Sequence, residues 1–302
     1  MNNSLSPYAT TRIIKPASVF KLGLLLGTLL MTSPSIAAPI TFNTALPVSE
    51  KQYIARALLV LDKKSTSATS SEKLGLTSVL GYGVTPKFTV FGILPSQLAE
   101  LGFSNDNDRD LALGDTELVG RYEVWRADKR GATKRLAPFA GVRLATGELS
   151  VSGDGTTDAF AGMIFTSATS KQNIDAQIRY DLNGSDNRTL QSNQTQRFSQ
   201  GNRISVDLSW QKRVLPKHID SATKGFWFAV LEGNLSHFQR NTVDGLSDDN
   251  SGGFVASIAP GVQYSTHRWI GEAAVRIPIV KDFNGISLEP DYTLFTSLRI
   301  KF

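Results

Sequence analysis

The sequence predicts an all-β protein: a transmembrane, up-and-down antiparallel β-barrel of about 12 strands. Three observations predict it. Apolar and polar residues alternate along much of the chain, long and short connections follow one another, and an N-terminal export signal is matched by a last strand that ends in Phe302. The composition, 41% hydrophobic and 20% charged, resembles that of a water-soluble protein. A barrel accommodates it because only alternate residues of each strand face lipid.

The first 37 residues have the features of a cleavable signal peptide. Arg12, Lys15 and Lys21 precede an apolar run from Leu22 to Met31, and residues 35–37 (Ser-Ile-Ala) have the small-x-small pattern that signal peptidase cuts. The alternative is an uncleaved membrane anchor, but the run is shorter than the roughly 20 residues that a spanning helix needs. We therefore predict export, with cleavage after residue 37.

This cleavage site divides the chain into a signal peptide (1–37), a periplasmic N-terminal segment (38–49) and an outer-membrane barrel (50–302). Segment 38–49 either stays in the periplasm or enters the barrel as a plug. Residues 1–37 hold three basic and no acidic residues, so their removal lowers the net charge from +5 to +2 and leaves no reason to expect nucleic acid as a partner. The chain has no cysteine, and a closed barrel needs no disulfide because each strand is hydrogen-bonded on both sides.

Twelve stretches read as strands: 50–62, 74–84, 87–94, 114–126, 134–146, 159–170, 173–183, 202–214, 225–239, 253–266, 268–280 and 290–302. Several alternate cleanly, with the period of two typical of a strand with one apolar face. In 173–183, one face holds Ile174, Ala176, Ile178, Tyr180 and Leu182. A soluble β-sandwich would alternate in the same way, so alternation alone does not separate the two folds.

The connections distinguish a barrel from a sandwich. Longer polar loops (63–73, 95–113, 147–158, 184–201 and 241–252) mostly alternate with short links near residues 85, 130, 171 and 267. An outer-membrane barrel with short periplasmic turns and longer extracellular loops has this rhythm, whereas a Greek-key sandwich has no reason for it. The medium link 215–224 and the short loop around 284–285 fit least well. An even strand count leaves both termini in the periplasm.

All four tryptophans are predicted at the periplasmic rim. Trp125 and Trp210 end downward strands, and Trp227 and Trp269 begin upward ones. These positions are typical of the interfacial aromatic girdle of an outer-membrane barrel. Strict alternation, however, turns Trp125 toward the lumen.

The last strand resembles the C-terminal assembly signal of outer-membrane proteins. Its characteristic residues are Tyr292, Leu298, Ile300 and the terminal Phe302. The resemblance implies recognition by the barrel-assembly machinery and insertion into the lipid of the outer membrane of a Gram-negative bacterium.

Short motifs resemble the outer-membrane family named after the meta-pathway of phenol degradation. They are Tyr82-Gly83-Val84-Thr85-Pro86-Lys87-Phe88, Gly114-Asp115-Thr116-Glu117-Leu118 with Arg121-Tyr122, Pro138 and Gly141, Leu144-Ala145-Thr146-Gly147, Ala259-Pro260-Gly261-Val262-Gln263-Tyr264, and Ile277-Pro278-Ile279 with Asn284-Gly285. Residues 148–250 are similar in pattern only. Members of this family are described as transporters of small, often aromatic or hydrophobic, molecules. The resemblance therefore implies passive passage of a small solute, which the sequence does not identify.

Charged residues on the polar faces are predicted to line the lumen, because an Arg or Lys that faces lipid at mid-membrane costs about 2–4 kcal/mol. They are Glu117, Arg121, Glu123, Arg143, Asp175, Arg179, Asp181, Asp207, Glu232, Glu272, Arg276 and Arg299. Acids and bases are nearly balanced, and about 12 strands enclose a narrow lumen. We therefore expect most of them to pair across it, which favours a selective or gated path over an open channel.

Three prolines fit the predicted strands poorly. Pro138, Pro260 and Pro278 fall inside predicted strands, where the missing N–H interrupts the hydrogen-bond ladder. Bulges or bends beside Gly141 and Gly261 are expected to absorb the first two.

An enzyme fits the sequence poorly. A hydrolase needs a serine within hydrogen-bond reach of a histidine. His218 and His267 fall at periplasmic turns, and Ser236 points to the strand face opposite its neighbour His237. We predict no catalytic residue.

Metal binding is not favoured either. Asp106, Asp108 and Asp110 imitate the spacing of a calcium loop, but Leu111 stands where that loop needs glycine. We predict no metal and no cofactor. The main alternative to transport is a surface protein that acts, structurally or adhesively, through its external loops.

Overall fold

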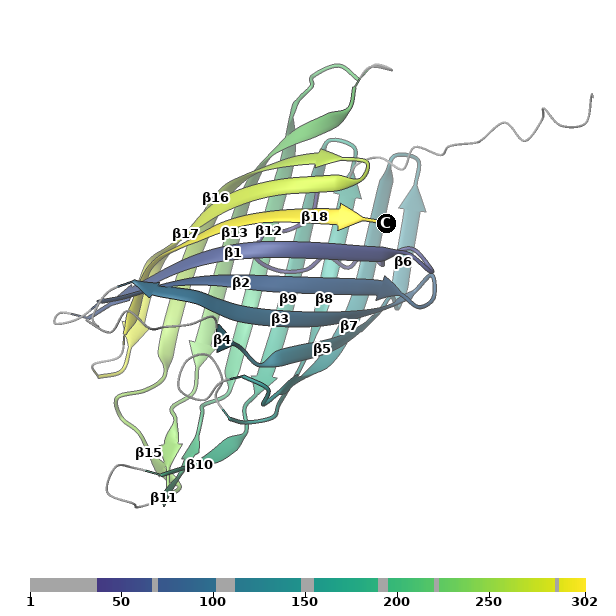
Figure 1. Ribbon diagram of the computed structural model, residues 1–302. Helices are drawn as coiled ribbons and strands as arrows, with labels where there is room; N and C mark the ends of the chain where they lie inside the picture. Colours follow the sequence, from purple (N-terminus) through teal and green to yellow (C-terminus); the bar gives the residue numbers. More distant parts are fainter. Residues whose placement is uncertain are drawn as a thin grey trace, which may run out of the picture. The chain divides into compact units, whose positions relative to one another are not determined.

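Long antiparallel strands follow one another around a closed ring (Figure 1). They are β1 (Tyr53–Ser65), β2 (Ser70–Gly83), β3 (Phe88–Leu101), β5 (Thr116–Tyr122) continued by β6 (Trp125–Lys129), β7 (Ala132–Leu144), β8 (Asp158–Thr169), β9 (Gln172–Leu182), β12 (Arg203–Leu215), β13 (Gly225–Phe238), β16 (Gly253–Thr266), β17 (Trp269–Phe283) and β18 (Glu289–Lys301). β1 pairs with both β2 and β18, which closes the ring. The predicted 12-stranded antiparallel barrel is confirmed.

This computed structural model describes residues 37–66, 70–101, 112–147, 155–189, 195–219, 223–285 and 288–302. The predicted signal peptide lies outside the described residues except for Ala37, and so do Asp106, Asp108 and Asp110 of the calcium-like loop. No helix formed by the described residues is long and apolar enough to cross a membrane.

Short strands occupy regions where the sequence predicts only loops. β4 (Ala112–Leu113) pairs with the end of β3, while β10 (Ser185–Thr189), β11 (Thr195–Ser199), β14 (Thr242–Val243) and β15 (Leu246–Ser247) form a separate four-stranded sheet. In addition, β2 begins in the predicted loop 63–73, and β3 runs to Leu101. These strand ends are polar or irregular in sequence, so no alternation signals them.

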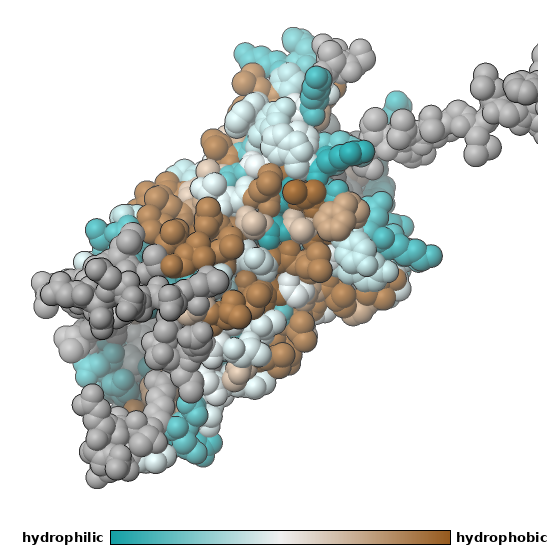
Figure 2. Space-filling view, viewed as in Figure 1, coloured by the Kyte–Doolittle hydropathy of each residue, from teal (hydrophilic) through white to brown (hydrophobic). Residues whose placement is uncertain are grey.

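Apolar side chains cover the outer wall of the barrel. Ile178, Leu208 and Leu298 are 48%, 55% and 46% exposed, while their neighbours in sequence point inward. Figure 2 shows hydrophobic side chains gathered over the middle of the visible face and hydrophilic ones toward its ends. The wall therefore presents a band suited to lipid.

The short turns 84–87, 130–131, 170–171 and 267–268 all lie at the end of the barrel where β1 begins and β18 ends. The connection 216–224 at this end is longer. The opposite end carries the longer loops, with 66–69 between β1 and β2 and 284–288 between β17 and β18 as short exceptions. Since outer-membrane barrels keep their short turns in the periplasm, we name the two ends periplasmic and extracellular.

The prediction that Trp125 faces the lumen is wrong. Its side chain is 46% exposed, and those of Trp210, Trp227 and Trp269 are 43%, 46% and 42% exposed. Opposite β7, Arg121 pairs with Phe139 but Trp125 pairs with Leu136, so one extra residue is inserted between β5 and β6. This bulge reverses the alternation and turns Trp125 outward with the other three.

The ladder accommodates all three prolines. Pro138 lies opposite the β5–β6 bulge, where β7 has no partner on that side. Pro260 falls in a gap of the β16–β17 pairing, and Pro278 lies where the register of that pairing shifts. A missing N–H costs little at such sites. For Pro138 the inserted residue lies on the neighbouring strand and not beside Gly141 as expected, whereas the gap at Pro260 directly precedes Gly261.

Candidate functional site

The N-terminal segment (38–49), named periplasmic in the division of the sequence, lies inside the barrel, which is the second of the two placements left open there. Ile40 is fully buried. The Glu232 carboxylate accepts hydrogen bonds from the backbone N–H groups of Ile40 (2.7 Å) and Thr41 (3.0 Å) and from the Thr41 hydroxyl (2.6 Å). The segment enters because the lumen side chains satisfy its backbone, a pairing that sequence periodicity does not reveal.

Side chains from several strands hold the rest of this segment. Arg121 donates to the carbonyl of Leu46 (2.7 Å), the Thr166 hydroxyl accepts from the N–H of Ala45 (2.8 Å), and Asn173 donates to the carbonyl of Ala37 (2.8 Å). Val48, Ala45 and Ala37 contact Thr89, Thr166 and Asn173, which all lie near the periplasmic ends of their strands. We call residues 37–48 the plug; its tip is Thr41–Asn43.

A charge network surrounds the base of the plug. Glu272 accepts from Arg56 (2.6 Å), Arg299 (3.0 Å) and Gln263 (2.7 Å), and Arg56 and Arg299 also donate to plug carbonyl groups. Asp175 accepts from Gln211 at 3.1 Å. The periplasmic half of the lumen is thus filled by the plug and by the polar groups that bind it.

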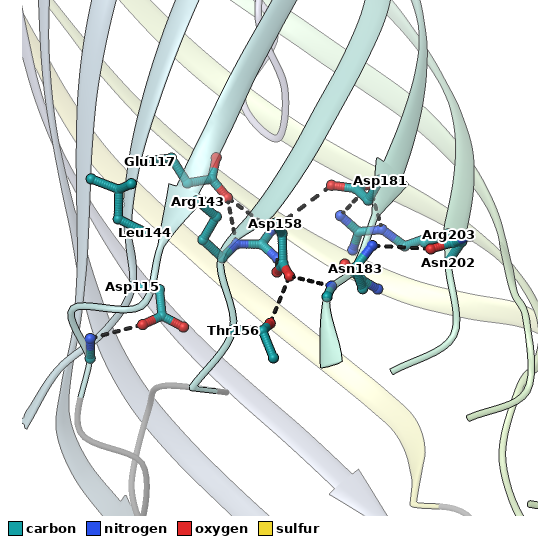
Figure 3. A network of polar contacts seen from close by, with 12 residues as sticks. Asp115, Glu117, Arg143, Leu144, Thr156, Asp158, Asp181, Asn183, Asn202 and Arg203 are labelled. Carbon is teal, nitrogen blue, oxygen red and sulfur yellow. Dashed lines mark hydrogen bonds and ion pairs between the residues drawn. The ribbon is translucent and has the colours of Figure 1, made fainter. Parts of the chain in front are cut away.

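A second network lies at the extracellular end (Figure 3). Arg143 donates to Glu117 (2.9 Å) and Asp158 (2.9 Å). Asp181 forms ion pairs with Arg179 (2.7 Å) and Arg203 (3.0 Å). The strands β5, β7, β8, β9 and β12 are therefore joined by alternating charges across their inner faces, as the balance of charges predicts.

We expect Arg143→Met to destabilise the barrel by about 3–5 kcal/mol. The reason is that Glu117 and the well-buried carboxylates of Asp158 and Asp181 lose the cation that they share. Urea unfolding of the purified barrel, followed by heat-modifiable electrophoretic mobility, measures this loss. Arg240→Met is the control, since Arg240 pairs with Asp249 in an exposed loop and such a pair contributes at most about 1 kcal/mol. Equal midpoints for the two variants would contradict the expectation.

A cavity of about 590 Å³ lies between the plug tip and the extracellular loops. One side, the apolar wall, consists of Phe91, Val119, Phe139, Phe160 and Ile164 on β3, β5, β7 and β8. The other side, the polar wall, consists of Gln177, Ser205, Asp207, Asn234, Ser236, Ser257 and Arg276 on β9, β12, β13, β16 and β17. Thr41, Phe42 and Asn43 form its floor.

The apolar wall was missed in the sequence, where only charged residues were projected inward. A repeated Phe-Ala-Gly motif signals it. Phe139 pairs with Gly162, and Gly141 pairs with Phe160. A Cβ added to Gly162 would lie 2.4 Å from the Phe139 ring, and one added to Gly141 would lie 2.5 Å from the Phe160 ring. Each ring therefore occupies the space that a side chain at the glycine of the neighbouring strand would fill.

The ring of strands is incomplete at the extracellular end between β17 and β18. Their pairing ends at Arg276 and Thr293, and no further pair joins these two strands among the described residues. Pro278 and Pro290 lie just beyond and lack N–H donors. Lys281 spans this seam with an ion pair to Glu289 at 3.0 Å. Phe283, Leu288 and Pro290 line the cavity, so the cavity reaches the seam.

All twelve residues predicted to line the lumen lie on the inner side of the wall, in different settings. Glu117, Arg143, Arg179 and Asp181 share the extracellular network, while Arg121, Asp175, Glu232, Glu272 and Arg299 surround the plug. Asp207 and Arg276 belong to the polar wall. That they line a solute path stays a prediction.

Glu123 lies apart from the others, at the β5–β6 bulge. It is 3% exposed and forms an ion pair with Arg135 at 2.7 Å, without hydrogen-bond geometry. Arg135 and Thr133 also donate to Asp128 and lower its pKa. The contact of Asp128 with Arg135 and Thr133 therefore stabilises the turn fully at pH values above the usual pKa of a carboxyl group. This stabilisation is lost as the pH falls through the lowered pKa.

Ser236 and His237 do not come together in the structure. His237 is exposed on the outer wall, whereas Ser236 is buried on the inner wall and donates to Asn234 (3.1 Å). No cluster of three or more His, Cys, Asp or Glu side chains suited to a metal ion occurs in the described part of the chain.

Comparisons with known proteins agree with the barrel. The fold matches the crystal structure of the COG4313 outer membrane channel from Pseudomonas putida F1 with a TM-score of 0.66 and 13% sequence identity. The match covers 88% of this chain and 100% of that channel. The NanC porin (TM-score 0.49, 13% identity, 82% and 100% coverage) and the β-domain of the Bordetella autotransporter BrkA (0.45, 8%, 84% and 100%) are more distant.

The sequence itself also places the chain in a family. No curated protein matches it significantly. A family model described as "Putative MetA-pathway of phenol degradation" matches residues 59–270, which span most of the barrel. This chain belongs to that family of outer-membrane barrels.

Proposed function

We propose that this protein is an outer-membrane channel for the passive passage of small molecules, aromatic or hydrophobic ones above all, and that the plug gates its lumen. The observation that carries the proposal is the cavity of about 590 Å³ above the plug tip. Its volume suits a small organic molecule, and an apolar surface beside a few polar groups is typical of ligand sites.

The way in which the plug is held supports gating. Its contacts to Glu232, Arg121, Thr166 and Asn173 are hydrogen bonds from side chains, and the ladder that closes the barrel does not pass through it. The plug can therefore leave the lumen without breaking the wall. The seam between β17 and β18 supports a second exit, sideways into lipid, that suits apolar solutes.

Transport is tested by swelling of liposomes that contain the purified full-length barrel. We expect benzyl alcohol to enter faster than glucose, because the apolar wall favours an aromatic body over a polyol. Protein-free liposomes correct for diffusion through lipid. Absence of any protein-dependent flux would refute the proposal.

A non-transporting surface protein is the second candidate. The sheet of β10, β11, β14 and β15 favours it, because this sheet orders two external loops into one surface. If neither the native barrel nor a plug-deleted variant passes any solute, this candidate is favoured.

A further inference from the structure

We propose that the cavity binds an organic anion with one carboxylate and a flat apolar body, and that Arg276 is its anchor. This inference rests on the proposed function and names the chemical class of solute. It follows from the division of the cavity into two walls and from the partners of each charged group that lines it.

The lining is strongly basic. Seven basic and only two acidic side chains face the cavity. Six of the basic ones are occupied: Arg179 and Arg203 pair with Asp181, Arg56 and Arg299 with Glu272, Lys64 with Asp62, and Arg121 with plug carbonyl groups. The seventh is Arg276, which forms no hydrogen bond or ion pair with the described residues.

The two acids that line the cavity are engaged elsewhere. Asp207 accepts from Asn234 (2.6 Å) and Gln177 (3.0 Å), and Asp62 accepts from Thr293 (2.8 Å). Neither forms an ion pair with Arg276, although the charge of Asp207 acts on the guanidinium from a greater distance. The guanidinium of Arg276 nevertheless contacts an aromatic ring, since it lies 5.0 Å from the centre of Phe295. The backbone of Arg276 forms the last pair between β17 and β18 before the seam.

A positioned arginine without a carboxylate partner is suited to a carboxylate from a solute. Arginine binds carboxylates through two parallel hydrogen bonds. Burying it against a neutral hydrocarbon would instead leave its donors unsatisfied. The polar wall adds neutral donors from Ser205, Asn234 and Ser257 around the same space.

The opposite wall determines the rest of the ligand. Phe139, whose ring centre lies 6.5 Å from that of Phe160, forms an apolar stretch of this wall with Val119 and Ile164, while the Arg179 guanidinium covers the Phe160 ring at 3.9 Å from its centre. A sugar or a phosphate would lose its water there without replacement, whereas an aromatic ring would gain contact. An aromatic carboxylate meets both walls at once.

Isothermal titration calorimetry with the purified full-length barrel tests this inference, using benzoate, benzyl alcohol and acetate as probes. We expect benzoate to bind at least about tenfold more tightly than either of the others, because only benzoate uses both walls. Arg276→Gln is expected to weaken benzoate by about tenfold and to leave benzyl alcohol unchanged, while Arg276→Lys restores part of the loss. Arg268→Gln, in an exposed periplasmic turn, is the control.

Heat-modifiable mobility establishes that each variant is folded. Equal affinity for benzoate and benzyl alcohol, or unchanged benzoate affinity in a folded Arg276→Gln variant, would overturn the inference. Liposome flux separates this failure from that of the proposed function. If benzyl alcohol passes through the barrel but benzoate is not preferred, only the anion site is wrong. If no solute passes, the proposed function fails as well.

Discussion

Deleting residues 39–48 is expected to raise the single-channel conductance in planar bilayers by about tenfold, because the periplasmic half of a lumen enclosed by 12 strands is then filled with water instead of protein. The barrel wall is expected to remain intact, since no strand of the ring includes these residues. Glu232→Ala, which removes three hydrogen bonds to the plug, is expected to give brief openings to the same level.

Asp249→Ala is the matched control, because it also removes a carboxylate but lies in an exposed loop. Its conductance is expected to equal that of the native protein. If the deleted form conducts no better than the native form while retaining its heat-modifiable mobility, the lumen is closed by something other than the plug, and gating by this segment is ruled out.

Tying β17 to β18 is expected to lower the uptake of apolar solutes several-fold. The native chain has no cysteine, so Lys281→Cys combined with Glu289→Cys places the only two thiols across the seam. A cleavable bifunctional thiol reagent then links the two strands where the native side chains form an ion pair. Liposome flux of benzyl alcohol measures the effect, and cleavage of the reagent is expected to restore it.

Two comparisons complete this test. Each single cysteine variant, treated with the same reagent, is expected to behave like the native protein. Passage of a small polar solute through the axial lumen is expected to change little when the seam is tied. Unaltered benzyl alcohol flux in the linked protein would show that the seam is not an exit for apolar solutes.

The barrel itself could be predicted from the sequence because its lipid-facing residues obey a strict period of two. In β9, Ile174 and Ile178 alternate with Asp175 and Arg179, and each lies on the face that alternation gives it. Alternation fails where the ladder is irregular. The single residue inserted between Arg121 and Trp125 reversed the orientation of Trp125, and a one-residue insertion leaves no trace in composition.

The site could be predicted only in part. Charged residues such as Arg143 and Glu272 lie inside because lipid excludes them. The plug could not be placed, because its backbone binds side chains more than 100 residues away, such as Thr166 and Glu232. The apolar wall was missed because Phe139 and Phe160 share a strand face with Arg143 and Asp158, and an apolar residue carries no signal of direction on a lumen face.

Blocking the cavity from outside tests most directly whether solutes pass through this lumen. Asn43→Cys places the only thiol of the chain on the plug tip, at the floor of the cavity. A bulky, charged reagent that forms a disulfide with this thiol is added on the extracellular side. It is expected to label the thiol and to abolish benzyl alcohol flux. Reduction of the disulfide is expected to remove the label and to restore the flux. Complete labelling with unchanged flux would contradict passage through the lumen.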